Sequence, residues 1–140
     1  MKYKKPILLV EDNPADVELT LRAFSKRKIF NPIEIARDGE EALLWIDKWE
    51  GGQITPAVIL LDLKLPLLSG LEVLEKLKSN GKLCTIPVVV LTTSSENTDM
   101  KKAYELGANS YIVKPIDFEK FVEVTTQIEI YWNVLNELPE

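Results

Sequence analysis

Short apolar runs alternate with longer amphipathic segments along this chain. Runs of strand length occupy residues 7–10, 33–36, 58–62, 87–93 and 110–113. Apolar side chains recur at helical spacing in residues 13–28, 39–50, 70–80, 97–107 and from about 118 onwards. Five strands that alternate with five helices predict an α/β fold, in which helices cover both faces of a doubly wound, five-stranded parallel sheet.

Local signals mark the ends of two of the predicted helices. Asn13 is placed to cap the first one, with Pro14 at its first helical position and Asp16 in its first turn. Gly107 is the last residue of the fourth helical segment and is placed as a helix-ending glycine. These signals agree with the boundaries that the apolar pattern predicts.

Length and charge limit the class of protein. A chain of 140 residues without an interdomain linker predicts one domain over 1–140, with an extended C-terminal helix and tail from about 118 to 140. The net charge of −5 argues against nucleic-acid binding through a broad basic face. No apolar run approaches the roughly 20 residues of a membrane helix. The single cysteine, Cys84, excludes an internal disulfide and fits a reducing cytoplasm.

The chain contains no histidine, which excludes several kinds of site. Ser-His and Cys-His nucleophile pairs are ruled out, and so are zinc sites built on histidine. With a single cysteine as well, the chain lacks ligands for soft metals. Any metal bound here is therefore expected to be a hard cation held by oxygen atoms.

Polar residues follow the predicted strands, at the sheet edge where ligands bind in open parallel sheets. Glu11 and Asp12 follow the first strand, Asp62 ends the third, Thr92 ends the fourth and Lys114 follows the fifth. Taken singly, each has an ordinary structural explanation as a cap, a strand residue or a solvated lysine. Three carboxylates at one edge repel one another, however, by about 4 kcal/mol for a pair ~4 Å apart. The set therefore predicts an oxygen-bound divalent cation, Mg²⁺ first.

A hard cation, a carboxylate nucleophile, a hydroxyl donor and an ammonium group together suit phosphoryl transfer, which depends on positioning and charge stabilisation. The chain contains neither a Walker A motif nor a G-x-G-x-x-G loop. We therefore expect the phosphoryl donor to be something other than a nucleotide bound by this chain.

Four segments together resemble the receiver domain of two-component response regulators: ILLVEDNPAD, VILLDLKLPLLSG, PVVVLTTSS and GANSYIVKP. The resemblance implies a receiver fold, with strands in the order 2-1-3-4-5. It also implies that Asp62 is the phosphoacceptor. Glu11 and Asp12, with Asp62 and the backbone carbonyl of Lys64, are then the ligands of Mg²⁺, which Mn²⁺ can replace.

The same resemblance assigns the other conserved positions of the family. Thr92 looks like the switch hydroxyl, Tyr111 like the switch aromatic and Lys114 like the family's lysine. Pro66 and Gly70 match the loop after the acceptor strand, and the family pattern implies a cis peptide between Lys114 and the proline after it. The donor is then a phosphohistidine of a sensor histidine kinase on another chain.

Three shorter matches narrow the resemblance: VEDNPAD, LTTS and the C-terminal YWNVLNELPE. They look most like single-domain regulators that serve bacterial phytochromes, notably in cyanobacteria. The kinase partner is then expected to be a phytochrome. No motif in this chain suggests covalent bilin binding, so light sensing is assigned to the kinase.

The last predicted helix carries two neighbouring apolar stripes. One consists of Phe118, Phe121, Thr125, Ile128, Trp132 and Leu135, and the other of Val124, Ile128, Tyr131, Leu135 and Leu138. One stripe is enough to cover the sheet, so the second favours a further partner. We expect a homodimer through the face formed by the fourth helix, fifth strand and fifth helix. The alternative is that the end folds back on its own domain.

Two other function classes remain open. A stand-alone phosphotransferase or phosphatase of the haloacid-dehalogenase type also uses an aspartate at a strand end, but it needs a second aspartate two residues later. Lys64 stands at that position, which disfavours this class strongly. The other class is a pseudo-receiver, an adaptor that acts through protein interactions without phosphorylation.

Overall fold

The computed structural model describes residues 5–114 and 117–136, of which 127 and 130–136 are described as backbone only. Strands and helices alternate in the order β1 (Ile7–Val10), α1 (Pro14–Lys26), β2 (Ile33–Ala36), α2 (Gly39–Glu50), β3 (Val58–Leu61), α3 (Gly70–Lys78), β4 (Val88–Thr92), α4 (Asn97–Glu105), β5 (Ser110–Val113) and α5 (Phe118–Asn136). The predicted alternation is confirmed.

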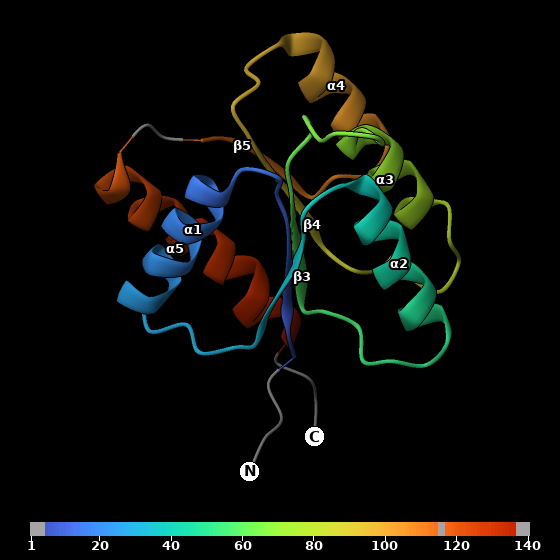
Figure 1. Cartoon of the computed structure of the whole chain (residues 1–140), viewed down its shortest axis with the longest axis horizontal. Helices are drawn as coiled ribbons and strands as arrows, with labels where there is room; N and C mark the ends of the chain where they lie inside the picture. The colour runs from blue at the N-terminus through green and yellow to red at the C-terminus, as the bar shows by residue number, and fades with distance from the viewer. Residues whose placement is uncertain (1–4, 115–116, 137–140) are drawn as a thin grey trace.

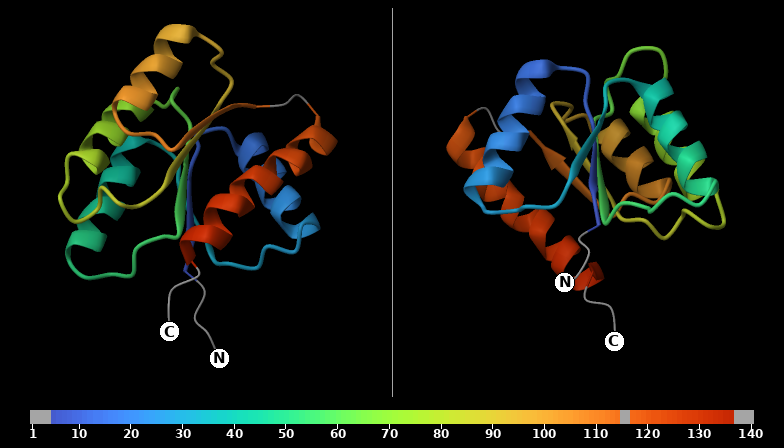
Figure 2. Two further views of the ribbon diagram at one scale, coloured as in Figure 1. Left: turned by 180° about the vertical axis from the view of Figure 1, so that it is seen from behind. Right: turned by 60° about the horizontal axis from the view of Figure 1, so that its bottom comes forward.

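The five strands form one parallel sheet in the order β2-β1-β3-β4-β5. Helices α1 and α5 pack together on one face, and α2, α3 and α4 cover the other (Figure 1). The views of Figure 2 show the same two helical layers with the sheet between them. The doubly wound fold and its strand order are therefore confirmed.

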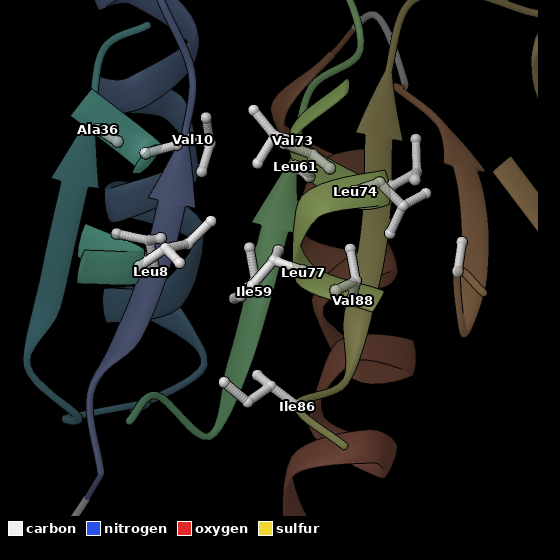
Figure 3. Packing of buried hydrophobic residues seen from close by; sticks show 14 of the residues in the cluster. Leu8, Val10, Ala36, Ile59, Leu61, Val73, Leu74, Leu77, Ile86 and Val88 are labelled. Carbon is white, nitrogen blue, oxygen red and sulfur yellow. The ribbon is translucent and has the colours of Figure 1, made fainter. Parts of the chain in front are cut away.

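The central strands are buried on both faces, which fixes the positions of their ends. Leu8 and Val10 point into the core beneath α2, α3 and α4, whereas Ile7 and Leu9 belong to the core beneath α1 and α5. Figure 3 shows the first of these cores, where strand side chains meet Val73, Leu74 and Leu77 of α3. Every residue of β3 is 0% exposed. Residues that directly follow such a strand are held by a rigid element.

Side-chain caps explain where α1 and α3 begin. The Asn13 side chain accepts hydrogen bonds from the backbone N–H groups of Ala15 and Asp16, and Pro14 is the first helical residue, as predicted. Ser69 and Glu72 form a capping box at the start of α3. These caps place the first turns of α1 and α3 directly beside the strand ends.

Several elements end slightly before the boundaries predicted from the sequence. Strand β3 ends at Leu61, so that Asp62 lies just beyond it, and β4 spans only Val88–Thr92. Helix α4 ends at Glu105, and Gly107 follows with a φ of +108°. This left-handed conformation favours glycine, in agreement with its predicted role as a helix-ending residue.

Helix α5 packs against its own domain along the first of the two predicted stripes. Phe121, Thr125 and Ile128 are at most 1% exposed. The side chains of Tyr131, Trp132, Leu135 and Leu138 lie outside the described residues, and so does the peptide bond between Lys114 and Pro115. The homodimer and the cis peptide therefore stay predictions. None of the helices that the structure describes has a stretch long and apolar enough to cross a membrane.

Gly70 is required because two backbone segments approach closely there. A Cβ atom at this position would lie 2.2 Å from the carbonyl oxygen of Asp62 and 2.6 Å from the Cα of Leu63. Both neighbours are backbone atoms at the end of β3, so relief requires that this strand end moves. We expect Gly70→Ala to lower the free energy of unfolding by about 1–3 kcal/mol, as overpacking typically does.

Urea denaturation measures this loss. Gly81→Ala is the matched control, because a Cβ at Gly81 meets nothing within 4 Å. We expect the control to change the free energy of unfolding by no more than about 0.5 kcal/mol, which is typical of surface substitutions. Equal effects of the two substitutions would contradict the steric explanation.

Candidate functional site

Three carboxylates meet at the carboxyl edge of the sheet. Parallel pairing aligns Val10 of β1 with Leu61 of β3, and the Asp62 N–H donates to the Val10 carbonyl at 3.1 Å. Glu11 and Asp62 therefore leave neighbouring strands at the same level. One carboxylate oxygen each of Glu11, Asp12 and Asp62 lies within 4.8 Å of the others. The Glu11 and Asp62 side chains are 3% and 8% exposed, whereas Asp12 is exposed.

Lys114 is a buried partner of these carboxylates and not a solvated surface residue. It follows β5, and its N–H donates to the carbonyl of Thr92 at 2.8 Å. Its side chain is 5% exposed, and Nζ donates to Glu11 Oε1, to Asp16 Oδ2 at 2.9 Å and to Asp62 Oδ2 at 3.2 Å. One ammonium group therefore joins residues that follow β1 and β3 to the first turn of α1.

Burial and mutual charge shift the pKa values of this group. Burial raises the pKa of Glu11 to about 7, against the lowering effect of Lys114. Burial alone lowers the pKa of Lys114, but its hydrogen bonds to Glu11 and Asp16 and the charge of Asp62 outweigh this and hold that pKa above its usual range. The lysine is thus a permanent positive charge at the site.

Thr92 and Tyr111 belong to a second hydrogen-bonded group, which is centred on Ser94. Thr92 is completely buried, and its Oγ1 accepts from the Ser94 N–H at 3.3 Å. The Tyr111 hydroxyl donates to the Ser94 carbonyl at 2.8 Å, and Ser94 Oγ donates to Asp99 of α4 at 2.7 Å. Within the described ranges, no hydrogen bond joins this group to the carboxylates of Glu11, Asp12 or Asp62. It connects the end of β4 to α4 and β5.

The loop after Asp62 holds that carboxylate by a backbone contact. The Lys64 N–H donates to Asp62 Oδ1 at 3.1 Å, and the Lys64 side chain is exposed. Pro66 is exposed, and Gly70 closes the loop by donating to the Leu63 carbonyl at 2.9 Å. The Lys64 carbonyl as a metal ligand stays a prediction. Its amide, however, already fixes one Asp62 oxygen.

The sequence of this chain matches a known protein family. A model of the response regulator receiver domain matches residues 7–126. The chain belongs to the response regulator receiver family. Several relatives and solved structures of response regulators match this chain over nearly all of its length.

Three of these relatives are informative. The probable methanogenesis regulatory protein FilR2 of Methanothrix harundinacea is 44% identical over 134 residues, which cover 95% of this chain and 86% of FilR2. The structure of the phosphorylated cyanobacterial phytochrome response regulator RcpA has a TM-score of 0.86 at 37% identity, and covers 98% of this chain and 99% of RcpA. The Mn²⁺-bound form of response regulator Rcp1, a Synechocystis protein, has a TM-score of 0.82 at 38% identity, with 96% and 97% covered.

The receiver site offers a donor set that suits a hard divalent cation. Glu11, Asp12 and Asp62 supply oxygen atoms only, and Lys114 neutralises just one of the three charges. The remaining excess of negative charge sits partly buried at one point, where a divalent cation relieves it. The residues present therefore fit divalent-cation binding, in line with the Mn²⁺-bound Rcp1 structure.

Three residues of the site were not recognised from the sequence. Asp16 was interpreted only as a first-turn acid of α1, yet it contacts Lys114. Ser94 and Asp99 were not singled out, although Ser94 joins Thr92 to Tyr111 and to α4. The available signal for Asp16 was its position four residues after Asp12 on a helix that begins directly at the strand end.

Cation binding is expected to be linked to a proton at Glu11. Because its pKa is about 7, Glu11 carries a proton below that pH, and a bound cation has to displace it. We expect the affinity for Mg²⁺ to rise with pH up to about 7 and to level off above it. Isothermal titration calorimetry in buffers of different ionisation enthalpy measures both the affinity and the proton released.

The same protonation of Glu11 should make the folding stability of the cation-free protein depend on pH. Between pH 4.5, the ordinary pKa, and about 7, the folded protein keeps the Glu11 proton and the unfolded chain releases it. Stability therefore falls as pH rises through this window. Glu11→Gln removes the titrating group and should flatten this part of the pH profile. An unchanged profile in that variant would assign the effect to another group.

Proposed function

We propose that this receiver accepts a phosphoryl group on Asp62 from a phosphohistidine of a sensor histidine kinase, in a reaction that requires Mg²⁺. The observation that carries the proposal is the convergence of Asp62 with Glu11, Asp12 and the buried ammonium of Lys114. The nucleophile Asp62 is thus placed beside two carboxylates that can bind a cation, and beside the fixed positive charge of Lys114. These are the parts that phosphoryl transfer needs from a protein.

The transfer step forms one bond and breaks one. A carboxylate oxygen of Asp62 attacks phosphorus in line, the bond from phosphorus to the donor nitrogen breaks, and the electron pair stays with the donor imidazole. Asp62 Oδ1 is held by the Lys64 N–H and Oδ2 by Lys114, so the carboxylate is oriented before attack. Glu11, Asp12 and Asp62 would hold the cation, which would supply positive charge to the phosphoryl oxygens.

The conformational switch is expected to involve the hydrogen-bonded group centred on Ser94. Thr92 accepts a hydrogen bond from Ser94, which leaves its own O–H free to donate to a phosphoryl oxygen. If Thr92 turns toward the phosphoryl group, its bond to Ser94 changes, and with it the contacts of Ser94 to Tyr111 and Asp99. Phosphorylation then shifts the population of two arrangements of the β4–α4 loop and Tyr111.

The partners are proposed from similarity and from the surface. The likeness to the phytochrome response regulator RcpA supports a phytochrome as the kinase. Exposed Tyr104 of α4 and Val113 of β5, at 49% and 41%, support a homodimer through the α4–β5–α5 face. We propose a cytoplasmic protein that acts through this surface and does not bind nucleic acid, given its net charge of −5.

Acetyl phosphate with and without Mg²⁺, followed by intact mass spectrometry, tests the proposal. We expect one added phosphoryl group in the presence of Mg²⁺ and none after chelation with EDTA. No added mass under either condition would favour the pseudo-receiver, which acts without phosphorylation. Sedimentation of both forms at several concentrations tests the dimer, and a monomer mass independent of concentration would rule it out.

A further inference from the structure

Lys114 binds a carboxylate that is not part of the cation group. Its ammonium has three N–H donors and three carboxylate partners, Glu11, Asp16 and Asp62. The three carboxylates close enough to share a cation are Glu11, Asp12 and Asp62. Within the part of the chain that the structure describes, Asp16 is the one carboxylate that contacts Lys114 and lies outside this group.

The cation and the lysine draw on the same carboxylates. A divalent ion bound by Glu11, Asp12 and Asp62 draws on two of the three partners of Lys114. A phosphoryl group on Asp62 makes the competition stronger, because it takes one oxygen of that carboxylate into an acyl bond and removes its negative charge. Asp16 is then the partner whose contact with the ammonium neither event removes.

We propose that Asp16 is a positioning residue, which holds the Lys114 ammonium beside Asp62 when the cation and the phosphoryl group engage the other carboxylates. The inference rests on the proposed phosphoacceptor function. It assigns a role to a residue of α1 that lies outside the set of residues expected from the receiver pattern. Lys114 is the group that touches the phosphoryl oxygens, and Asp16 acts through it.

The backbone of Asp16 is fixed on both sides, as this role requires. Its N–H donates to the Asn13 side chain at 3.4 Å, and its carbonyl accepts from the Thr20 hydroxyl at 2.8 Å. The cap on α1 therefore sets the position of the Asp16 carboxylate relative to the strand ends. Its side chain is 29% exposed, compared with 3% for Glu11, so its carboxylate loses less of its hydration.

Without the contact to Asp16, the long and flexible Lys114 side chain has no remaining carboxylate partner of its own in the cation-loaded protein. Misplacement of a charged group by about 1 Å can slow a reaction about 100-fold. Because Lys114 stays tethered at the end of β5, we expect a smaller effect for Asp16→Ala, about tenfold in the rate of Asp62 phosphorylation. The affinity for Mg²⁺ should change little, since Asp16 is outside the cation group.

The kinetic experiment compares three variants with acetyl phosphate at saturating Mg²⁺. Asp16→Ala should be about tenfold slower than the wild type. Asp16→Asn keeps an oxygen acceptor at the same place and should recover most of the rate. Glu18→Ala is the matched control, because it removes an exposed carboxylate from the same helix and should leave the rate unchanged. Should Asp16→Ala fail to fold, Asp16→Ser, which also suits a helix N-terminus but is too short to reach Lys114, replaces it.

A second readout does not depend on phosphorylation. In protein labelled with ¹⁵N at lysine, a hydrogen-bonded ammonium exchanges its protons slowly and gives a sharp NMR signal. We expect a Lys114 signal in the Mg²⁺-loaded wild type and in Glu18→Ala, and its loss in Asp16→Ala or Asp16→Ser. A merely structural role for Asp16 would leave this signal in place.

The two readouts separate the inference from the function on which it rests. A wild-type protein that takes up no phosphoryl group disproves the proposed function. The NMR signal of the Lys114 ammonium still tests whether Asp16 positions it. A wild-type rate in Asp16→Ala, or a Lys114 signal that survives in the Mg²⁺-loaded variant, overturns the role of Asp16.

Discussion

Asp62→Asn is expected to abolish phosphorylation by acetyl phosphate, whatever the concentration of Mg²⁺. The amide is nearly the same size as the carboxylate, but it lacks the anionic oxygen that attacks phosphorus. Its oxygen can still accept the hydrogen bond from the Lys64 N–H, so the loop after β3 keeps its shape. Lys114 retains Glu11 and Asp16 as partners. The loss is therefore chemical, and the fold should be preserved.

Intact mass spectrometry after incubation with acetyl phosphate measures the loss, and circular dichroism checks the fold. Asp47→Asn is the matched control, since it makes the same change at an exposed position on α2. We expect the control to take up one phosphoryl group as the wild type does. Stable labelling of Asp62→Asn would move the acceptor to another residue, and Asp12 would be examined next.

The fold was predictable because its determinants are local. In β3 four consecutive apolar residues indicate burial on both faces, and each of them is fully buried. The Asn13-Pro14 cap of α1 is readable for the same reason, since the groups that bond lie within three residues of each other. Boundaries were less accurate, because the last residue of a strand depends on its neighbour: β3 ends where its pairing with β1 ends, at Leu61.

The site was predictable as far as topology determines it. Parallel strands bring their carboxyl ends to one edge, which was enough to place Glu11, Asp12, Asp62 and Lys114 together. Their expected roles as acceptor, cation ligands and fixed charge came from resemblance to the family. Topology did not indicate how deeply Lys114 is buried, because a residue after an edge strand is usually solvated.

Asp16, Ser94 and Asp99 depend on how helices and loops pack, which neither periodicity nor strand order determines. Asp16 reaches Lys114 only because α1 begins directly beside the strand ends. Ser94 lies in the loop between β4 and α4, and its bond to Asp99 requires that the first turn of α4 faces back toward this loop. Such contacts join segments that are distant in the sequence or irregular, and they become visible in the three-dimensional structure alone.

Lys114→Met is expected to lower the free energy of unfolding without a cation by about 3–5 kcal/mol, as the loss of one partner from a buried ion pair does. Methionine keeps an unbranched apolar stem but removes the ammonium. Glu11 and Asp62, at 3% and 8% side-chain exposure, then lose the buried countercharge that they share. Phosphorylation should also become much slower, because no fixed positive charge then faces the phosphoryl oxygens.

Urea denaturation in EDTA and in saturating Mg²⁺ separates this electrostatic cost from a loss of packing. Mg²⁺ should stabilise Lys114→Met more than the wild type, because the cation supplies the missing countercharge to Glu11 and Asp62. Lowering the pH should also reduce the cost, since a protonated Glu11 is no longer a buried anion. Because Lys114 lowers the pKa of Glu11, which is about 7 in the wild type, this protonation should occur at a higher pH in the variant. Lys120→Met, at an exposed position on α5, is the matched control and should change stability by no more than about 0.5 kcal/mol. A loss in Lys114→Met that neither Mg²⁺ nor protons reduce would mean that Lys114 stabilises the protein by packing, and that it is not the charge partner of the site.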